Sequence, residues 1–283
     1  MITGLDHLVL LARDYPDAVR RHEALLGCKP AWRTEGDGAA TALFTLANMS
    51  IEIMAPSGKG ATGDRVRARL DEQGEGLASL CFRVGGIDSF HRRLRRLSMN
   101  PEDVAASGST NADDGATLTW NRTRTPVEAA HGVRLFFLEL DSERPRSPAV
   151  AEAPIHGLDH VVIATDRPER AAALYGARLG LDMRLDLTRP DWNARLMFFR
   201  CGDLVVEIVH RLNEATRGEH DRLWGLSWRA TDIAASHARL ASAGFDVSDI
   251  KTGRRPGTHV FTVRNAPLGV PTLIIQPEAP RDH

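Results

Sequence analysis

Two nearly identical apolar segments constrain the fold of this chain more than any other feature. Residues 4–12 read GLDHLVLLA and residues 157–165 read GLDHVVIAT, so the two copies begin 153 positions apart. A second match follows at almost the same offset, where IEI at 51–53 corresponds to VEI at 206–208. Self-similarity over such a distance indicates a tandem duplication. With 283 residues, the chain is long enough for two domains of ordinary size.

Each copy divides again into two smaller units with the same order of elements. In the first unit the apolar strand is followed by PDAVRRHEALLG, in which Pro16 suits a first helical turn and Gly27 suits a helix end. Strand-like segments follow, and the pattern restarts at LASLCFRV, residues 77–84. The sequence therefore predicts an α+β fold of four βαβββ units in tandem.

The domain boundaries follow from the repeat and from a change in composition. The segment 143–154 is rich in proline and charge, which is typical of a linker. We therefore predict a first domain at 1–142 and a second domain at 155–283. A further connection, SGKGATGDRVRARLDEQGE, joins the two units of the first half, and we expect it to contain one short helix.

Charge and cysteine content limit the partners and the compartment. The chain has 36 basic and 37 acidic side chains, and this balance argues against nucleic acid or an anionic membrane as the main partner. No signal-peptide pattern occurs at the start, and no apolar run approaches the ~20 residues of a membrane span. Cys28, Cys81 and Cys201 are far apart, as in buried thiols of a reducing compartment. We expect a cytoplasmic protein that binds a small-molecule substrate or ligand, with a homodimer as the candidate assembly.

Several segments resemble those of the vicinal oxygen chelate superfamily, which includes glyoxalase I, extradiol dioxygenases, and bleomycin- and fosfomycin-resistance proteins. The opening strand and helix of both halves carry this resemblance, together with EGLASLCFRVGGID and the closing strand LFFLEL. The resemblance covers almost the whole chain. It implies two glyoxalase-like domains, each a pair of units whose curled mixed sheets surround a pocket.

Within that fold, the histidine of the repeated segment has a partner. Side chains of a strand alternate between its faces, and the first and fourth strands of such a unit lie side by side. His7 and Glu52 could thus meet on the inward face, and His160 and Glu207 could repeat the arrangement. An imidazole and a carboxylate suit a divalent first-row ion. The alternative is a His–Glu ion pair without a metal, since a carboxylate inside an apolar run needs compensation.

Metal-binding members of the superfamily usually take one ligand from the first and last strand of each unit. In this chain those positions are His7, Glu52, Ser79 and Glu139 in the first half, and His160, Glu207, Gly225 or a neighbour of it, and Gln276 in the second. The resemblance implies a divalent ion (Zn, Ni, Mn or Fe) on His7, Glu52 and Glu139, with Glu139 also able to serve as a catalytic base. It implies a weaker metal site at His160 and Glu207. The iron triad of extradiol dioxygenases is not completed, which disfavours that activity.

Two functions therefore remain. The first is metal-assisted lyase or isomerase chemistry on a small oxygen-rich substrate. The second is metal-free binding or sequestration of a small molecule, as in bleomycin resistance. In either case Arg122, Arg264 and His259 are candidate substrate-binding residues, because an inward-facing arginine would bind a carboxylate or phosphate. No Ser-His-Asp motif, phosphate loop or dinucleotide fingerprint occurs, so hydrolases, kinases and NAD enzymes have no support from motifs.

Overall fold

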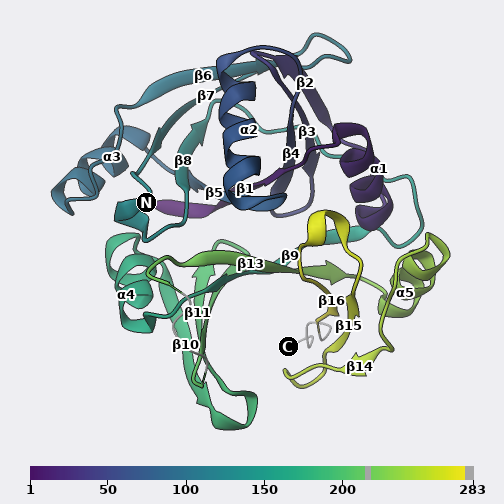
Figure 1. Cartoon of the computed structure of the whole chain (residues 1–283). Coiled ribbons are helices and arrows are strands. Elements are labelled where there is room, and N and C mark those ends of the chain that lie inside the picture. Colours follow the sequence, from purple (N-terminus) through teal and green to yellow (C-terminus); the bar gives the residue numbers. More distant parts are fainter. Residues whose placement is uncertain (214–217, 278–283) are drawn as a thin grey trace.

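The computed structural model describes residues 1–213 and 218–277, and it contains two eight-stranded sheets of identical topology (Figure 1). The first has the order β2-β3-β4-β1-β5-β8-β7-β6 and the second the order β10-β11-β12-β9-β13-β16-β15-β14. The first sheet consists of β1 (Ile2–Leu11), β2 (Trp32–Gly36), β3 (Ala39–Thr45), β4 (Ser50–Pro56), β5 (Gly76–Val84), β6 (Ala105–Thr110), β7 (Thr117–Arg124) and β8 (Leu135–Leu140). The second consists of β9 (Ile155–Ala164), β10 (Asp182–Arg189), β11 (Ala194–Cys201), β12 (Leu204–Arg211), β13 (Arg222–Ala230), β14 (Lys251–Thr252), β15 (His259–Val263) and β16 (Thr272–Gln276).

The helices follow the strands in the order that the repeat predicts. They are α1 (Tyr15–Leu26), α2 (Ala61–Gln73), α3 (Ile87–Arg96), α4 (Pro168–Ala172) with its continuation η2 (Ala173–Arg178), and α5 (Ile233–Ser242), with short turns η1 (Glu128–Ala130), η3 (Pro190–Trp192) and η4 (Pro267–Gly269). The first and fourth strands of each unit are parallel neighbours, as in β1 with β4 and β9 with β12. The predicted fold, α+β with four tandem βαβββ units, is confirmed. No helix in the two described ranges is long and apolar enough to span a bilayer.

The core lies between the sheets and the helices on their outer faces. On β1, Leu8 and Leu10 are buried on the helix side, whereas His7 and Val9 point to the concave side. Phe82 of β5 stacks on Phe137 of β8 with ring centroids 5.9 Å apart. One continuous apolar cluster runs through both halves of the molecule. Burial of alternate residues thus fixes which side chains of each strand face the concave side.

Paired arginines join the two halves. Arg239 of α5 donates hydrogen bonds to the carbonyl oxygens of Ala24 and Leu25, at 2.5 and 2.9 Å, where α1 ends. In the equivalent helix of the first half, Arg93 donates to Arg178 O at 3.1 Å, where η2 ends. Each arginine therefore satisfies carbonyls that a helix C-terminus leaves without partners. The two halves are held together by a pseudo-symmetric pair of such contacts.

The concave faces of the two sheets differ because only the first is covered. Val66 and Leu70 of α2 pack against Leu11 of β1, and Figure 1 shows α2 lying across the first sheet. A second apolar cluster on the same side contains Trp32, Leu43, Leu118 and Trp120. In the second half the connection between β12 and β13 is short, and its described part forms no helix. Within residues 1–213 and 218–277, a helix therefore covers the first concave face and no helix covers the second.

A substitution in α2 tests how tightly this helix is docked. A Cβ atom at Gly63 would lie 2.0 Å from Gly38 O, so alanine there would force backbone to move. We expect Gly63→Ala to lower the free energy of unfolding by about 1–3 kcal/mol, as overpacking does. Gly36→Ala is the control, since a Cβ at Gly36 meets nothing within 4 Å. Urea unfolding would measure both, and equal stability of the two variants would contradict this docking.

Candidate functional site in the second half

A β-bulge explains why each repeated segment carries an Asp-His pair. Leu5 and His7 face consecutive residues of β5, so Asp6 is an extra residue in β1. Leu158 and His160 face consecutive residues of β13 in the same way, so Asp159 is the extra residue in β9. A bulge re-aims the side chain at the insertion. Both aspartates thereby reach the Nδ1 atom of the following histidine, at 2.7 Å for His7 and 2.9 Å for His160.

In the first half, the structure brings the predicted pair together in a closed environment. His7 Nε2 lies 3.7 Å from Glu52 Oε2, and the carboxylate of Asp6 is fully buried. Arg144, from the segment after β8, lies 2.6 Å from Asp6 and is itself only 7% exposed. Burial acts to raise the pKa of Asp6, but His7 and the charges of Arg144 and Arg83 outweigh it and hold that pKa at about 2. The His7 site is thus an ion-pair network built into the wall of the first sheet.

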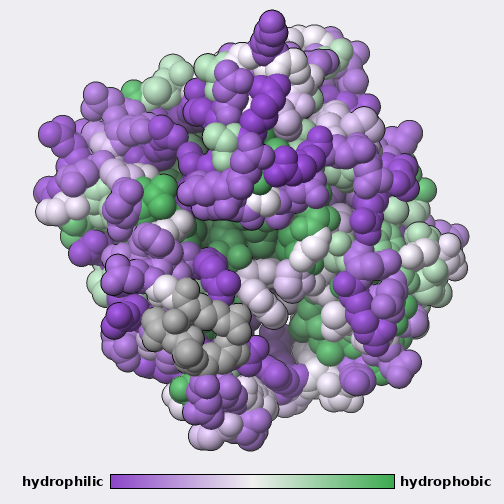
Figure 2. Space-filling view, in the orientation of Figure 1, coloured by the Kyte–Doolittle hydropathy of each residue, from purple (hydrophilic) through white to green (hydrophobic). Residues whose placement is uncertain are grey.

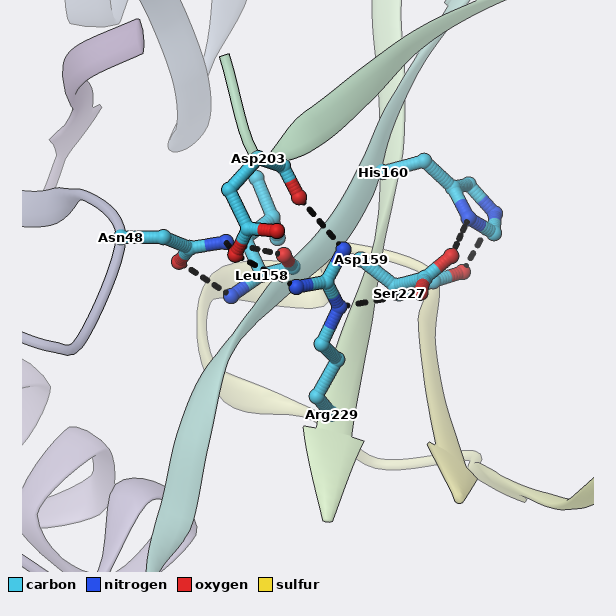
Figure 3. A network of polar contacts seen from close by, with 7 residues as sticks. All are labelled: Asn48, Leu158, Asp159, His160, Asp203, Ser227 and Arg229. Carbon is cyan, nitrogen blue, oxygen red and sulfur yellow. Dashed lines mark hydrogen bonds and ion pairs between the residues drawn. The ribbon is translucent and has the colours of Figure 1, made fainter. Parts of the chain in front are cut away.

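In the second half, three polar side chains contact the ring of His160, and Figure 3 shows two of them, Asp159 and Ser227. Its Nε2 atom lies 2.7 Å from Ser227 Oγ and 3.1 Å from Glu207 Oε2. Its Nδ1 atom contacts Asp159, whose other oxygen accepts from Arg229 at 3.1 Å. The ring is therefore fixed by contacts at both nitrogens. This is the arrangement from which a histidine exchanges protons with a neighbour.

A cavity of about 1020 Å³ opens above this cluster. Its walls are the inward-facing residues of the second sheet, mostly apolar, among them Val162, Leu196, Phe198, Leu226, Leu273 and Ile275. Asp159, His160, Glu207 and Ser227 all line it. Figure 2 shows the surface hollowed in the lower half of the view, with apolar residues around the hollow. Apolar walls with a few convergent polar groups are characteristic of a small-molecule site.

Arginines give this cavity a positive side. Arg184, Arg211, Arg222, Arg254 and Arg255 all line it. Arg254 stacks on the ring of Trp192 with its Cζ atom 4.1 Å from the ring centroid. Burial raises the pKa of Glu207, while the charges of His160 and Arg254 act to lower it. The positive charge of Arg254 therefore acts on the carboxylate of Glu207, on the cavity floor.

Glu139, the expected third ligand and base of the first half, lies on the other face of the sheet. Its carboxylate accepts hydrogen bonds from the backbone N–H groups of Gly86 and Ile87, at 2.8 and 2.9 Å, where α3 begins. Gln276 is placed the same way in the second half and accepts from Ile233 N at 2.8 Å. Both side chains cap a helix, where a negative or dipolar oxygen is stabilised. Neither joins the histidine and glutamate of its own half.

The residue opposite each histidine also differs from the expectation. Register places Cys81 opposite His7 and Ser227 opposite His160, whereas Ser79 and Gly225 lie two residues away. Among the residues described, no group of three or more His, Cys, Asp or Glu side chains could hold a metal ion. The donors present do not complete a three-ligand site in either half, because His160 Nε2 is shared by a hydroxyl and one carboxylate. The predicted metal ligands thus converge only as two His–Glu pairs.

The predicted substrate-binding residues lie outside the open cavity. Arg264 pairs with Asp246 at 2.6 Å on the surface. His259 is exposed on β15, and Arg122 is exposed on β7 of the first sheet. Arg254 is the basic side chain, within the described residues, that both stacks on an aromatic ring and acts to lower the pKa of Glu207. Its signal in the sequence was GRRPGT, a glycine- and proline-containing turn with two arginines.

Comparisons with known proteins agree with this architecture. A family model described as glyoxalase-like domain matches residues 5–180, and one described as glyoxalase/bleomycin resistance protein/dioxygenase superfamily matches residues 159–262. A mutant of 4-hydroxymandelate synthase from Streptomyces coelicolor has a TM-score of 0.72 at 14% identity, over 100% of this chain and 95% of that one. A Mn(II)-bound glyoxalase from Novosphingobium aromaticivorans has a TM-score of 0.66 at 12% identity, over 97% and 82%.

A halotolerant catechol dioxygenase is similar to the same extent, with a TM-score of 0.65 at 14% identity over 100% of this chain and 89% of that one. Identities this low show a common fold and do not extend to activity. No curated protein matches the chain.

Proposed function

Because the chain belongs to the glyoxalase-like domain family of the vicinal oxygen chelate superfamily, we propose that it binds a small organic anion in the second cavity and catalyses proton transfer on it. This is chemistry of the isomerase or lyase type. The observation that carries the proposal is the contact of 3.1 Å between His160 and Glu207 on the floor of a cavity of about 1020 Å³. The first sheet, covered by α2, has a structural role in this account.

The charge and shape of the cavity support an anionic ligand with an apolar body. A guanidinium binds a carboxylate through two parallel hydrogen bonds. The stack on Trp192 would orient the guanidinium of Arg254 for such a ligand. The remaining walls are largely aliphatic and aromatic. Arg254 would then place the acidic carbon of the ligand over Glu207.

The state of Glu207 supports proton transfer. A carboxylate whose pKa is raised by burial is a stronger base than an exposed one. Negative charge that develops on the ligand would be stabilised by Arg254. His160, oriented by Asp159 and Ser227, would exchange the proton with Glu207.

A divalent metal is the usual electrophile of this superfamily, and one structural neighbour is a Mn(II)-bound glyoxalase. Among the described residues that line the second cavity, one imidazole and one carboxylate converge, His160 and Glu207, where three protein ligands are the norm. We therefore assign no step to a metal.

Deuterium exchange tests the proposal. A panel of small carbon acids that bear a carboxylate is incubated with the protein in D₂O, and loss of each C–H signal is followed by proton NMR. We expect faster exchange for at least one compound, reduced about 10²–10⁴-fold by Glu207→Gln, as removal of a general base predicts. Glu52→Gln, the same change in the first half, is the control and should exchange at the wild-type rate.

The outcomes separate the two functions that the fold supports. Exchange that survives Glu207→Gln, or that is lost in Glu52→Gln, would refute the assignment. Tight binding without exchange would favour sequestration of the ligand, which the apolar walls also suit.

A further inference from the structure

Ser227, His160 and Asp159 form a hydrogen-bonded chain that faces the second cavity (Figure 3). The Oγ atom of Ser227 lies 2.7 Å from His160 Nε2, and His160 Nδ1 lies 2.9 Å from Asp159 Oδ1. We propose that Ser227 is the nucleophile of a hydrolytic centre for small esters. The proposal goes beyond the proton transfer described above, although it uses the same cavity and several of the same residues, among them His160 and Arg254.

The geometry meets the requirements for an activated serine. A nucleophile and its base must lie within hydrogen-bond reach, and a third group must orient the base. Asp159 accepts from His160 Nδ1, so the lone pair of Nε2 is directed at the hydroxyl of Ser227. The roles are recognised by geometry, since such triads recur on unrelated folds in different chain orders.

The aspartate is itself held in place. Arg229 donates through Nε to Asp159 at 3.1 Å and through Nη1 to Asp203 at 2.7 Å. Asp203 is also within 3.4 Å of Asn48 Nδ2, whose amide hydrogen-bonds the backbone of Leu158. Figure 3 shows this chain of contacts leading from the first half to the cavity. Support of this kind fixes the orientation of a catalytic histidine.

Glu207 lies beside the same nitrogen of His160, with its Oε2 atom 3.1 Å from Nε2. The hydroxyl of Ser227 and the carboxyl group of Glu207 therefore both contact this nitrogen, and both face the cavity.

The reaction balances without a co-reactant other than water. Ser227 Oγ attacks the acyl carbon, a C–O bond forms, and the hydroxyl proton passes to His160 Nε2. The bond to the leaving alcohol breaks, and the alcohol takes that proton. Water then attacks the acyl-enzyme, gives its proton to His160, and releases the acid as Ser227 is re-protonated. The positive side of the cavity, with Arg254, would stabilise the oxyanion.

The first half supplies an internal contrast. Cys81 occupies the equivalent position opposite His7 and is 2% exposed, and burial raises the pKa of its thiol well above the usual range. α2 covers that face of the sheet. Ser227 is only 3% exposed, and what exposure it has is to the cavity. Substrate must therefore enter the cavity to reach it, which favours esters of small aryl or branched aliphatic acids.

Covalent labelling with diisopropyl fluorophosphate tests the proposal, because this reagent phosphorylates activated serines with loss of fluoride. We expect intact-mass analysis to show one adduct per chain and peptide analysis to place it on Ser227. Ser227→Ala should take no label, and His160→Gln should be labelled at least about 100-fold more slowly. Ser236→Ala removes a buried serine of the same half and should be labelled like the wild type.

A thermal unfolding scan of Ser227→Ala shows whether that variant is folded, so that loss of labelling is not caused by misfolding. Ser227→Cys adds a positive test, since iodoacetamide should alkylate that position in the folded protein. An adduct on another residue, or equal labelling of His160→Gln, would overturn the proposal. Wild-type protein that exchanges deuterium yet takes no label would overturn the nucleophile and leave the proton transfer standing.

Discussion

Replacing Arg254 with methionine is expected to weaken the binding of a small carboxylate roughly 30- to 150-fold, which corresponds to the about 2–3 kcal/mol of hydrogen bonds to a charged group. Methionine keeps the apolar stem over Trp192 and removes the charge. The guanidinium of Arg254 stacks on Trp192 and lines the second cavity. Isothermal titration calorimetry with the carboxylate panel would measure the change.

Arg264→Met is the matched control for that measurement. Its guanidinium is bound to Asp246 at 2.6 Å and lies outside the cavity, although the strand pattern made it a candidate anion anchor. We expect affinity within about twofold of wild type, since an exposed pair contributes little. A large loss in Arg264→Met, with none in Arg254→Met, would move the binding site away from the second cavity.

Asp6→Asn is expected to lower the free energy of unfolding by about 3–5 kcal/mol, the usual cost of breaking a buried ion pair from one side. Asp6 is fully buried and contacts His7, Arg83 and Arg144. Asparagine fits the same space but leaves the buried Arg144 without a counter-charge. Urea unfolding would measure the loss, with the exposed pair member Asp246 changed to Asn as the control.

The same residue gives a pH dependence with a defined sign. The pKa of Asp6 falls from 3.8 to about 2 on folding. A depressed carboxyl contributes stability that is complete above the unfolded pKa and is lost as the pH falls through the folded one. Wild type should therefore lose roughly 2–3 kcal/mol between about pH 5 and pH 1 from this group. This loss of stability at low pH should be missing in Asp6→Asn. If the free energy of unfolding fell with decreasing pH in the same way in both proteins, the assignment would be contradicted.

The fold was predictable because the duplication, and the alternation of buried and exposed residues along each strand, can be recognised in short segments of sequence. The resemblance implied that the first and fourth strands of a unit are neighbours, and period-two alternation then predicted that His7 would meet Glu52 and that His160 would meet Glu207. Alternation failed on β8, where five of the six residues of LFFLEL are apolar and neither face is marked. The carboxylate of Glu139 consequently lies at α3 instead of beside His7.

Two features of the site could not be predicted from the sequence, namely which half holds the open cavity and the contact between Ser227 and His160. The reason differs from the one for Glu139. The bulges at Asp6 and Asp159 shift the pairing of β1 and β9, so the residue opposite each histidine depends on register and not on spacing. Ser227 and His160 are 67 positions apart, beyond any local motif. That α2 covers the first concave face depends on long-range packing.

A crystal structure grown with the tightest carboxylate of the panel and with Mn²⁺ tests the central claim most directly. The account predicts the ligand in the second cavity, with its carboxylate on Arg254 and its acidic carbon over Glu207. A ligand bound through a metal ion at His7 and Glu52, or lodged anywhere outside the second sheet, would contradict it.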